Sequence, residues 1–525
     1  MDNGLGYWSY KHADLNADRE AFVQGESRVT YALFNVRTNK LASALEGIGV
    51  GKGDRVALLS TNSIEFMEVL FAVAKLGAIC VPLNFRLAGP ELAYAIVNSE
   101  SRALFYSADL HGSTQAALSV PEVVDLQHVV CIPVDEADNA VDVPDGVTLL
   151  GYEALLESGR PQDAHHAVDA DDPLLILYTS GTTGRPKGAM LTHHNMYANA
   201  IHLILAGQGL SRYDKTITPC PLFHVGGLCV HTVPLFYTGG CTVIMREFDP
   251  AGLLKMMEQE KATVEFLVPA MWSAVVRVPD FDSYDLSALR YTQSGGAPCP
   301  ITVIEFLQSK GWDFLEGFGM TETCAGAMVL DADNATRKLG AVGKPVMHDD
   351  ARVVDEAGAD VPQGTVGELV MRGPNIFIGY WKMPDATADA IRDGWFHTGD
   401  LARIDDEGFF WIVDRKKDMI ITGGENVYPI ETEQVLHHHP AIADVAVIGV
   451  PDEKWGETVV AVVVPEPGAT LAAEEVIGYA RERIARYKAP TRVEMIEELP
   501  RNATGKILKR ELRRIYTGRE ESVSR

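Results

Sequence analysis

Short apolar runs alternate with helix-forming segments through the first half of the chain, and this alternation limits the folds open to it. The run at 54–60 precedes a segment that Ser63 can cap as a helix and that Gly77 can end. A second apolar run follows at 78–81. Strands that alternate with helices predict a mainly parallel sheet covered by helices on both faces. The sequence therefore indicates an α/β fold.

The same pattern returns further along and then changes near residue 340. Four more strand-like runs lie at 174–178, 242–245, 263–268 and 290–293. From about 340 to 413 short strands separated by turn residues predict an antiparallel or barrel-like piece. A dense charged stretch at 414–418 is then followed by helix, strand, strand, helix, strand and helix. We therefore predict a large domain at 1–413, a boundary at 414–418 and a small α+β domain at 419–525.

Net charge and cysteine use bear on partners and compartment. The chain carries 46 Lys and Arg against 72 Asp and Glu, a formal charge of −26, which argues against nucleic acid or anionic lipid as partners. The seven cysteines form no C-x-x-C pair, so we expect buried free thiols. No signal peptide is visible, and the longest apolar stretch, 69–83, is too short and too interrupted to span a bilayer. These features predict a cytoplasmic protein with no transmembrane segment.

The strongest local motif is the loop from Tyr178 to Gly188, which follows an apolar run. Its glycines let backbone N–H groups approach a ligand, its hydroxyls donate hydrogen bonds, and Lys187 adds a positive charge. The spacing is not that of a Walker A loop, because Gly188 and not Ser or Thr follows the lysine. A polar surface turn is the alternative interpretation. Six hydroxyl or charged side chains in the ten residues 179–188 favour a phosphate site.

Six motifs follow one another along the chain: 178–188, 221–227 (PLFHVGG), 317–323 (GFGMTET), 394–400 (GWFHTGD), 414–418 (DRKKD) and 500–506 (PRNATGK). Together they resemble the acyl-CoA synthetases of the adenylate-forming superfamily, which also contains adenylation domains of nonribosomal peptide synthetases and firefly luciferases. The resemblance runs from about residue 20 to 515.

The resemblance implies a two-step reaction that uses ATP, Mg²⁺ and coenzyme A. A carboxylate attacks the α-phosphate of ATP to give an acyl-adenylate and pyrophosphate, and the thiol of coenzyme A then takes the acyl group and releases AMP. Thr321 would contact phosphate, and Glu322 would be the Mg²⁺ ligand. The loop residues that would hold the β- and γ-phosphates are Thr179, Ser180, Gly181, Thr182, Thr183, Gly184 and Lys187.

The resemblance also implies where the nucleoside binds. A carboxylate can accept hydrogen bonds from two neighbouring ribose hydroxyls, and Asp400 would take that role with Arg415 as a second contact. Small residues would let the flat adenine approach the backbone. The adenine slot would be formed by Gly295, Gly296, Ala297 and Pro298 on one side and Glu316, Gly317 and Phe318 on the other.

Three further roles follow from the same resemblance. Lys506 would draw the carboxylate and the α-phosphate together in the first step, acting when the small domain closes over the large one. Lys417 occupies the hinge position, where a backbone rotation would reorient that domain. The thiol's entry tunnel would then be approached by Gly423, Gly424 and Glu425.

The acyl pocket would be lined by His224, Val225, Gly296, Cys324 and Ala325. Small residues after Met320 leave room for a medium or long fatty acid or a bulky ring acid. An aromatic acid–CoA ligase, a ligase that loads an acyl carrier protein, a luciferase-like oxygenase and a silent nucleotide-binding protein are the alternatives. Assembly is left open, with a homodimer among the choices. The segment 481–514 holds 11 basic against 5 acidic residues, so small anions can bind an acidic chain locally.

Overall fold

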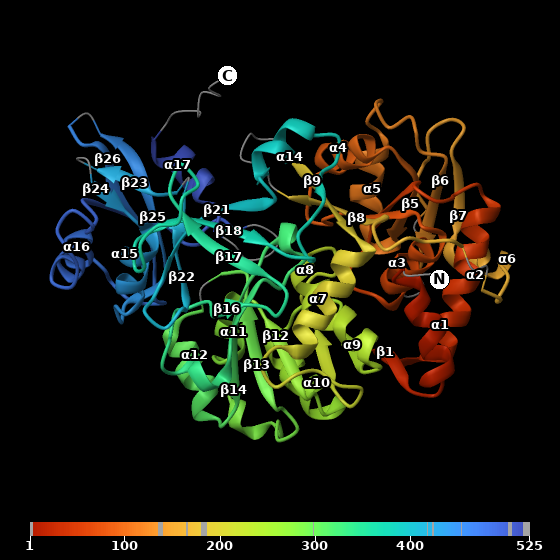
Figure 1. Ribbon diagram of the computed structural model, residues 1–525, viewed down its shortest axis with the longest axis horizontal. Helices are drawn as coiled ribbons and strands as arrows, with labels where there is room; N and C mark the ends of the chain where they lie inside the picture. Colours follow the sequence, from red (N-terminus) through yellow and green to blue (C-terminus); the bar gives the residue numbers. More distant parts are fainter. Residues whose placement is uncertain are drawn as a thin grey trace.

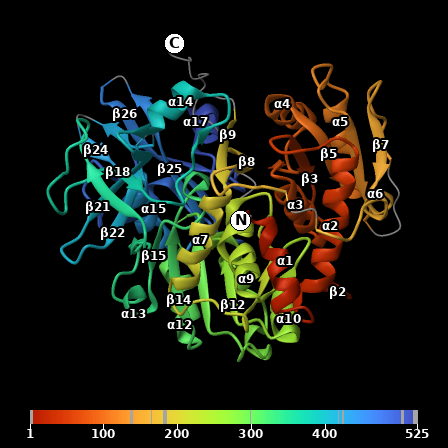
Figure 2. The same cartoon turned by 45° about the vertical axis from the view of Figure 1, so that its right-hand side comes forward.

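The computed structural model describes residues 4–134, 140–163, 166–179, 186–297, 299–416, 418–422, 425–452, 454–501 and 507–517. Figures 1 and 2 show the C-terminal α+β unit, in blue, at the opposite end of the molecule from the red N-terminal helices. The helices, apart from single-turn 3₁₀ segments and a π-helical turn at 228–232, are α1 (Gly6–Leu15), α2 (Tyr31–Gly47), α3 (Ile64–Leu76), α4 (Gly89–Ser99), α5 (His111–Leu118), α6 (Tyr152–Ser158), α7 (His193–Leu205), α8 (Val225–Gly227), α9 (Val233–Thr238), α10 (Pro250–Glu260), α11 (Pro269–Val275), α12 (Ile301–Ser309), α13 (Ala332–Ala335), α14 (Pro384–Ala390), α15 (Pro429–His437), α16 (Ala473–Arg481) and α17 (Lys509–Thr517).

Three sheets build the large N-terminal part, and the parallel strand pairs in each confirm the predicted α/β class. The first has the order β19 (Gly379–Tyr380), β9 (Lys187–Thr192), β8 (Pro173–Thr179), β4 (Ile79–Pro82), β3 (Arg55–Leu59), β5 (Ser101–Ser107), β6 (His128–Ile132) and β7 (Thr148–Gly151). The second has the order β12 (Val264–Leu267), β13 (Tyr291–Gly295), β14 (Asp313–Phe318), β15 (Met328–Leu330) and β16 (Lys344–Pro345). The third has the order β10 (Lys215–Thr218), β11 (Cys241–Ile244), β1 (Glu20–Gln24) and β2 (Ser27–Thr30).

Helix α3 shows how local sequence sets an element of the first sheet. The Ser63 hydroxyl accepts a hydrogen bond from the N–H of Phe66, and Gly77 ends the helix in the left-handed conformation with φ +66°. Apolar side chains surround most of the helix, and it is buried along its whole length. Strand β4 follows directly. The predicted helix and the predicted strand after it are both confirmed.

The antiparallel piece is present, and its strands are β17 (Asp350–Val354), β18 (Gly367–Arg372), β21 (Trp395–Ile404), β20 (Ile391–Arg392) and β22 (Phe410–Arg415). All four pairings within it are antiparallel. Strand β19 leaves this piece and pairs with β9 of the first sheet. Strand β22 runs to Arg415, so the first two residues of the predicted hinge lie in a strand. The domain limits themselves stay a prediction.

The small C-terminal unit has one sheet formed by β24 (Glu425–Val427), β23 (Ile420–Thr422), β26 (Gly456–Pro465), β25 (Ile442–Asp452) and β27 (Arg492–Met495). Its own apolar core includes Val447, Val459 and Ala461. The side chains of Asp418 and Arg513 form an ion pair at 2.8 Å, which ties α17 to the start of the unit. All seven cysteines are buried free thiols, as expected. Among the described residues, no helix is both long and apolar enough to cross a bilayer.

Candidate active site

The predicted adenine residues lie where two parallel strands end side by side. Gly295 at the end of β13 pairs with Gly317 in β14. A Cβ atom built on Gly295 would lie 3.0 Å from the carbonyl oxygen of Gly317, so a side chain would crowd the gap. Gly296 follows with φ +87°, and it and Ala297 are exposed. The two strand ends thus form a flat surface that a planar ring could approach.

Glu316, which precedes Gly317 in β14, stabilises this surface. Its carboxyl is buried, and its Oε1 accepts a hydrogen bond from the N–H of Cys299 at 3.1 Å. Burial raises the pKa of Glu316 to about 7, although the Cys299 hydrogen bond opposes the shift. Glu316 therefore holds the turn after β13 in place. Phe318 ends β14 and is partly buried against the antiparallel piece, and Pro298 lies outside the described residues.

Glu322 lies in a buried single turn formed by residues 321–323, which also contains Thr321. Its Oε1 accepts a 2.8 Å hydrogen bond from the hydroxyl of Tyr380. The ring of Tyr380 also faces Lys187, whose Nζ lies 4.9 Å from the ring centroid. Tyr380 thus joins the predicted metal ligand to the predicted phosphate-binding lysine. No sequence pattern predicts a role for Tyr380, because the two-residue strand β19 leaves no periodic signal.

Asp400 and Arg415 face each other across β21 and β22. Nε of Arg415 lies 2.9 Å from Oδ1 of Asp400, whose side chain is buried. Burial raises the pKa of Glu322, the Tyr380 hydrogen bond and the charge of Arg415 lower it, and the charge of Asp400 raises it. All four polar groups therefore belong to one site.

The phosphate loop is described at its two ends. Thr179 ends β8 and Lys187 starts β9, and the Thr179 hydroxyl donates to the Lys187 carbonyl oxygen at 3.4 Å. Ser180, Gly181, Thr182, Thr183 and Gly184 lie outside the described residues. The hairpin ends lead toward the site because Lys187 contacts Tyr380.

The predicted acyl-pocket residues come from two segments. His224 caps the short helix α8, where its Nδ1 accepts from the N–H of Gly226 at 3.1 Å, and Val225 is buried. Cys324 and Ala325 adopt left-handed conformations with φ of +53° and +85°. Such angles are costly for residues with a Cβ, so contacts of the loop must enforce them.

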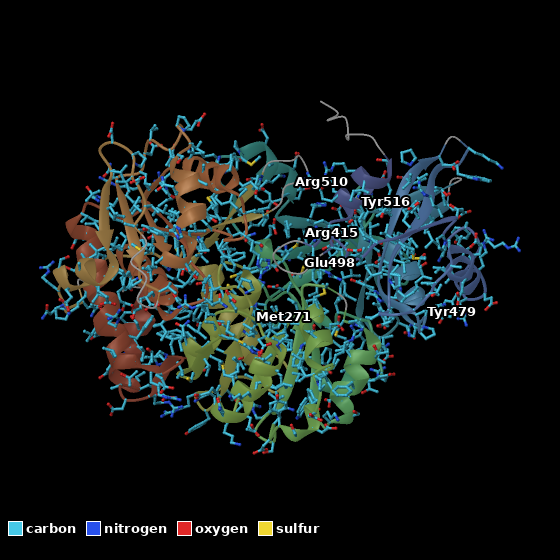
Figure 3. All side chains as sticks on the ribbon, turned by 180° about the vertical axis from the view of Figure 1, so that it is seen from behind. Met271, Arg415, Tyr479, Glu498, Arg510 and Tyr516 are labelled. Atoms are coloured by element: carbon cyan, nitrogen blue, oxygen red, sulfur yellow. The ribbon has the colours of Figure 1, made fainter. Side chains whose placement is uncertain are left out.

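The remaining predicted residues belong to the C-terminal unit or lead into it. Figure 3 shows Arg415 where that unit begins, with Arg510 and Tyr516 of α17 also labelled. Glu425 starts β24 and is exposed. Lys417, Gly423, Gly424 and Lys506 lie outside the described residues, so their roles stay predictions.

The donors that are described fit Mg²⁺ and ATP. Mg²⁺ is usually held by one or two carboxylates together with phosphate oxygens and water. Glu322 supplies one buried carboxylate, and the described residues contain no group of three His, Cys, Asp or Glu that could enclose a metal ion alone. The glycine-lined strand ends give the space a base would need.

Two family models match the chain. The model described as AMP-binding enzyme matches residues 10–381, and the model described as AMP-binding enzyme C-terminal domain matches residues 431–506.

Relatives of the chain match over nearly its whole length. Feruloyl-CoA synthase of Amycolatopsis is 40% identical over 515 residues, covering 98% of this chain and 99% of the relative. Indoleacetate–CoA ligase of Aromatoleum aromaticum is 40% identical over 512 residues, covering 97% and 98%. Long-chain-fatty-acid–CoA ligase FadD13 of Mycobacterium tuberculosis is 38% identical over 521 residues, covering 98% of both.

Solved structures share the fold. ATP-bound MatB from Rhodopseudomonas palustris matches with a TM-score of 0.88 at 32% identity, covering 98% of this chain and 99% of that one. Apo MatB from the same organism matches with a TM-score of 0.77 at 31% identity, covering 99% of both.

Proposed function

This chain belongs to the family of AMP-binding, adenylate-forming enzymes, and we propose that it joins a carboxylic acid to coenzyme A. The first half-reaction consumes ATP, forms an acyl-adenylate and releases pyrophosphate. In the second, the thiol sulfur attacks the acyl carbon and AMP leaves. The observation that carries the proposal is the site in which Glu322, Asp400 and Arg415 act on one another beside the two glycine-lined strand ends.

The charges of this site suit a reaction between two anions. The substrate carboxylate and the triphosphate repel each other, so positive charge must lie where negative charge builds up. Lys187, which faces the ring of Tyr380, and Arg415, which pairs with Asp400, supply it. We assign Asp400 to the ribose hydroxyls and Glu322 to Mg²⁺, which when bound neutralises phosphate charge.

We further propose that the C-terminal unit is placed as in a ligase that holds ATP. MatB bound to ATP and MatB without it have the same fold, yet this chain matches the ATP-bound form better, with TM-scores of 0.88 and 0.77. Because both comparisons cover almost the whole chain, the difference favours one relative placement of the parts. Lys506 would then reach the first half-reaction from the C-terminal unit.

For the acid, we propose a substrate with a bulky apolar ring. The ring of Phe266 lies between the His224 loop and the adenine surface, because Cβ atoms built on Gly226 and Gly295 would each lie 3.5 Å from it. Small residues such as Ala325 and Gly326 follow on the other segment. A flat aromatic wall beside small residues favours a planar group. Two relatives named for ring acids are 40% identical to this chain, and the one named for long-chain fatty acids is 38% identical.

The test is an acid panel with ATP and Mg²⁺, run with and without coenzyme A. Hydroxycinnamates, arylacetates and saturated fatty acids of six to sixteen carbons represent the competing classes. AMP release that needs both a ring acid and coenzyme A supports the proposal. Higher kcat/KM for fatty acids would overturn the substrate class and leave the ligase activity standing.

A second outcome separates the acceptor. Acid-dependent exchange of pyrophosphate into ATP without thioester formation would favour transfer to a carrier protein. A matched pair of variants shows that the signal comes from this site. Glu322→Gln should abolish exchange with every acid, and Glu356→Gln, an exposed glutamate on the antiparallel piece, should keep it. Absence of exchange with every acid in the unmodified enzyme would overturn the proposed function.

A further inference from the structure

Two buried asparagines hold the loop at 321–327, which carries Glu322. Asn199 of α7 accepts a hydrogen bond from the N–H of Gly326 at 3.0 Å and donates to the carbonyl of Cys229 at 2.8 Å. Asn375 donates from Nδ2 to the carbonyls of Thr323 at 3.0 Å and Gly326 at 2.7 Å. Both asparagine side chains are fully buried. The side-chain amides of Asn199 and Asn375 thus hold the loop in place through hydrogen bonds.

The loop needs these hydrogen bonds because its own backbone is strained. Cys324 and Ala325 are consecutive residues with positive φ, a conformation that costs free energy when a Cβ is present. The loop also packs tightly against Gly319, where a Cβ atom would lie 1.4 Å from the carbonyl oxygen of Ala325. If the amide of Asn375 turned over, its oxygen would face two carbonyl oxygens. The orientation of that amide therefore controls the loop.

The carboxyl group of Asp349, which has no part in the proposed reaction, lies close to Asn375. A Cβ atom built on Gly373 would lie 1.8 Å from Oδ1 of Asp349 and 2.9 Å from Oδ1 of Asn375. Both side-chain oxygens therefore lie next to Gly373. Neither oxygen of Asp349 nor Oδ1 of Asn375 has a hydrogen-bond partner among the described residues. All three are buried acceptors, and buried acceptors without a donor are costly.

A proton on the carboxyl group of Asp349 supplies the hydrogen-bond donor that these buried acceptors lack. We propose that Asp349 is a positioning residue, a neutral acid whose O–H donates to Oδ1 of Asn375 and thereby fixes the amide that holds the 321–327 loop. The catalytic importance of this loop rests on the proposed function. The N–H groups of Asn375 are both committed to backbone carbonyls, so they leave its oxygen as the acceptor for the proton. No atom of Asp349 needs to touch the substrate.

The surroundings favour the neutral acid. Burial raises the pKa of Asp349 to about 7, the nearby amide of Asn375 opposes the shift, and the charge of Asp350 adds to it. Asp350 is paired with Arg372 at 2.7 Å, and Nδ1 of His348 lies 3.0 Å from Nε2 of His202. Glu322, the acid of the loop, is buried as well. Above neutral pH the Asp349 proton leaves to solvent, two acceptors then face each other, and the loop loosens.

Hydrogen exchange of the free, full-length enzyme tests the proposal without any substrate. The observable is the protection of the backbone amides at 321–328, corrected for the intrinsic exchange rate, at pH 6 and pH 8. We expect protection to fall about tenfold between the two pH values, as one lost hydrogen bond of about 1.4 kcal/mol requires. In Asp349→Asn the side-chain N–H replaces the O–H and does not titrate, so protection should stay high at both pH values.

Further variants separate positioning from simple damage. Asp349→Ala should lose the protection at both pH values. His348→Gln should keep the pH dependence of the unmodified chain. Asp350→Asn removes a charge that helps raise the pKa of Asp349, so it should keep the loss of protection with rising pH but move its midpoint to lower pH. Retained pH dependence in Asp349→Asn would overturn the proposal, even if Asp349→Ala does not fold.

Activity gives a separate reading. Pyrophosphate exchange of the unmodified enzyme should fall above pH 7, and Asp349→Asn should keep it at pH 8. If no acid supports exchange, the proposed function fails while the hydrogen-exchange result still decides the role of Asp349. If exchange is present and its alkaline fall is the same in Asp349→Asn, the positioning role fails while the proposed function stands.

Discussion

The hydroxyl of Tyr380 donates a 2.8 Å hydrogen bond to Oε1 of Glu322, although 58 residues separate them in the chain. Both side chains lie where β19 joins the first sheet beside the start of β9. Burial raises the pKa of Glu322, and this hydrogen bond opposes that effect by lowering it. Tyr380 thus keeps a buried carboxyl available in its ionised form.

Tyr380→Phe should therefore weaken the site at low pH. Without the hydroxyl the pKa of Glu322 rises further, so a larger fraction is protonated and unable to hold Mg²⁺. A hydrogen bond to a charged group is worth roughly 1.5–3 kcal/mol, so we expect about a tenfold or greater loss of pyrophosphate exchange near pH 6. Exchange should be measured against pH and Mg²⁺ concentration. Tyr31→Phe, which loses a buried hydroxyl contact to Gly240, is the control and should leave the Mg²⁺ dependence unchanged.

Arg415→Lys should weaken ATP binding. The change keeps the charge and removes the planar guanidinium whose Nε lies 2.9 Å from Asp400. Loss of this orientation should raise the KM for ATP about tenfold. The matched control is Arg352→Lys, whose Nε faces exposed Asp360 at 2.6 Å on the same antiparallel piece. An equal effect of both substitutions on KM would contradict the role of Arg415.

Glu316→Gln should remove a pH-dependent loss of stability. Burial raises the pKa of Glu316 from 4.5 to about 7, so its contribution is full below pH 4.5 and is lost as pH rises through 7. The free energy of unfolding of the variant should gain about 3 kcal/mol on the unmodified protein between pH 4.5 and 8. Denaturant unfolding measures the difference. Glu305→Gln, at an exposed position of the adjacent helix α12, should show no such gain.

Sequence patterns were informative where local chemistry decides the structure. The apolar runs at 54–60 and 78–81 became β3 and β4, because Gly and Pro limit them and a capped helix separates them. The run at 290–293 likewise overlaps β13, which ends at Gly295, whereas no strand was predicted over β14, which carries Gly317.

Contacts between distant segments could not be read in the same way. Tyr380 meets Glu322 only because a two-residue strand leaves the antiparallel piece and joins β9. Asp349 and Asn375 are 26 positions apart, and neither belongs to a motif. The hairpin of β23 and β24 was also missed, since each strand has three residues. Such short pairings depend on tertiary packing and leave no periodic signal.

Lys506→Ala should separate the two half-reactions. The resemblance places this lysine on the C-terminal unit as the group that draws the two anions together, and only acyl-adenylate formation brings two anions into contact. We expect the variant to lose acid-dependent pyrophosphate exchange by at least about a hundredfold, the usual scale for removing one charge-stabilising group. It should still convert supplied acyl-adenylate and coenzyme A to thioester at near the normal rate. Arg510→Ala changes another basic side chain of the same unit and should keep both half-reactions. If both fell equally in a folded Lys506→Ala protein, the lysine would serve the whole cycle and not its first step.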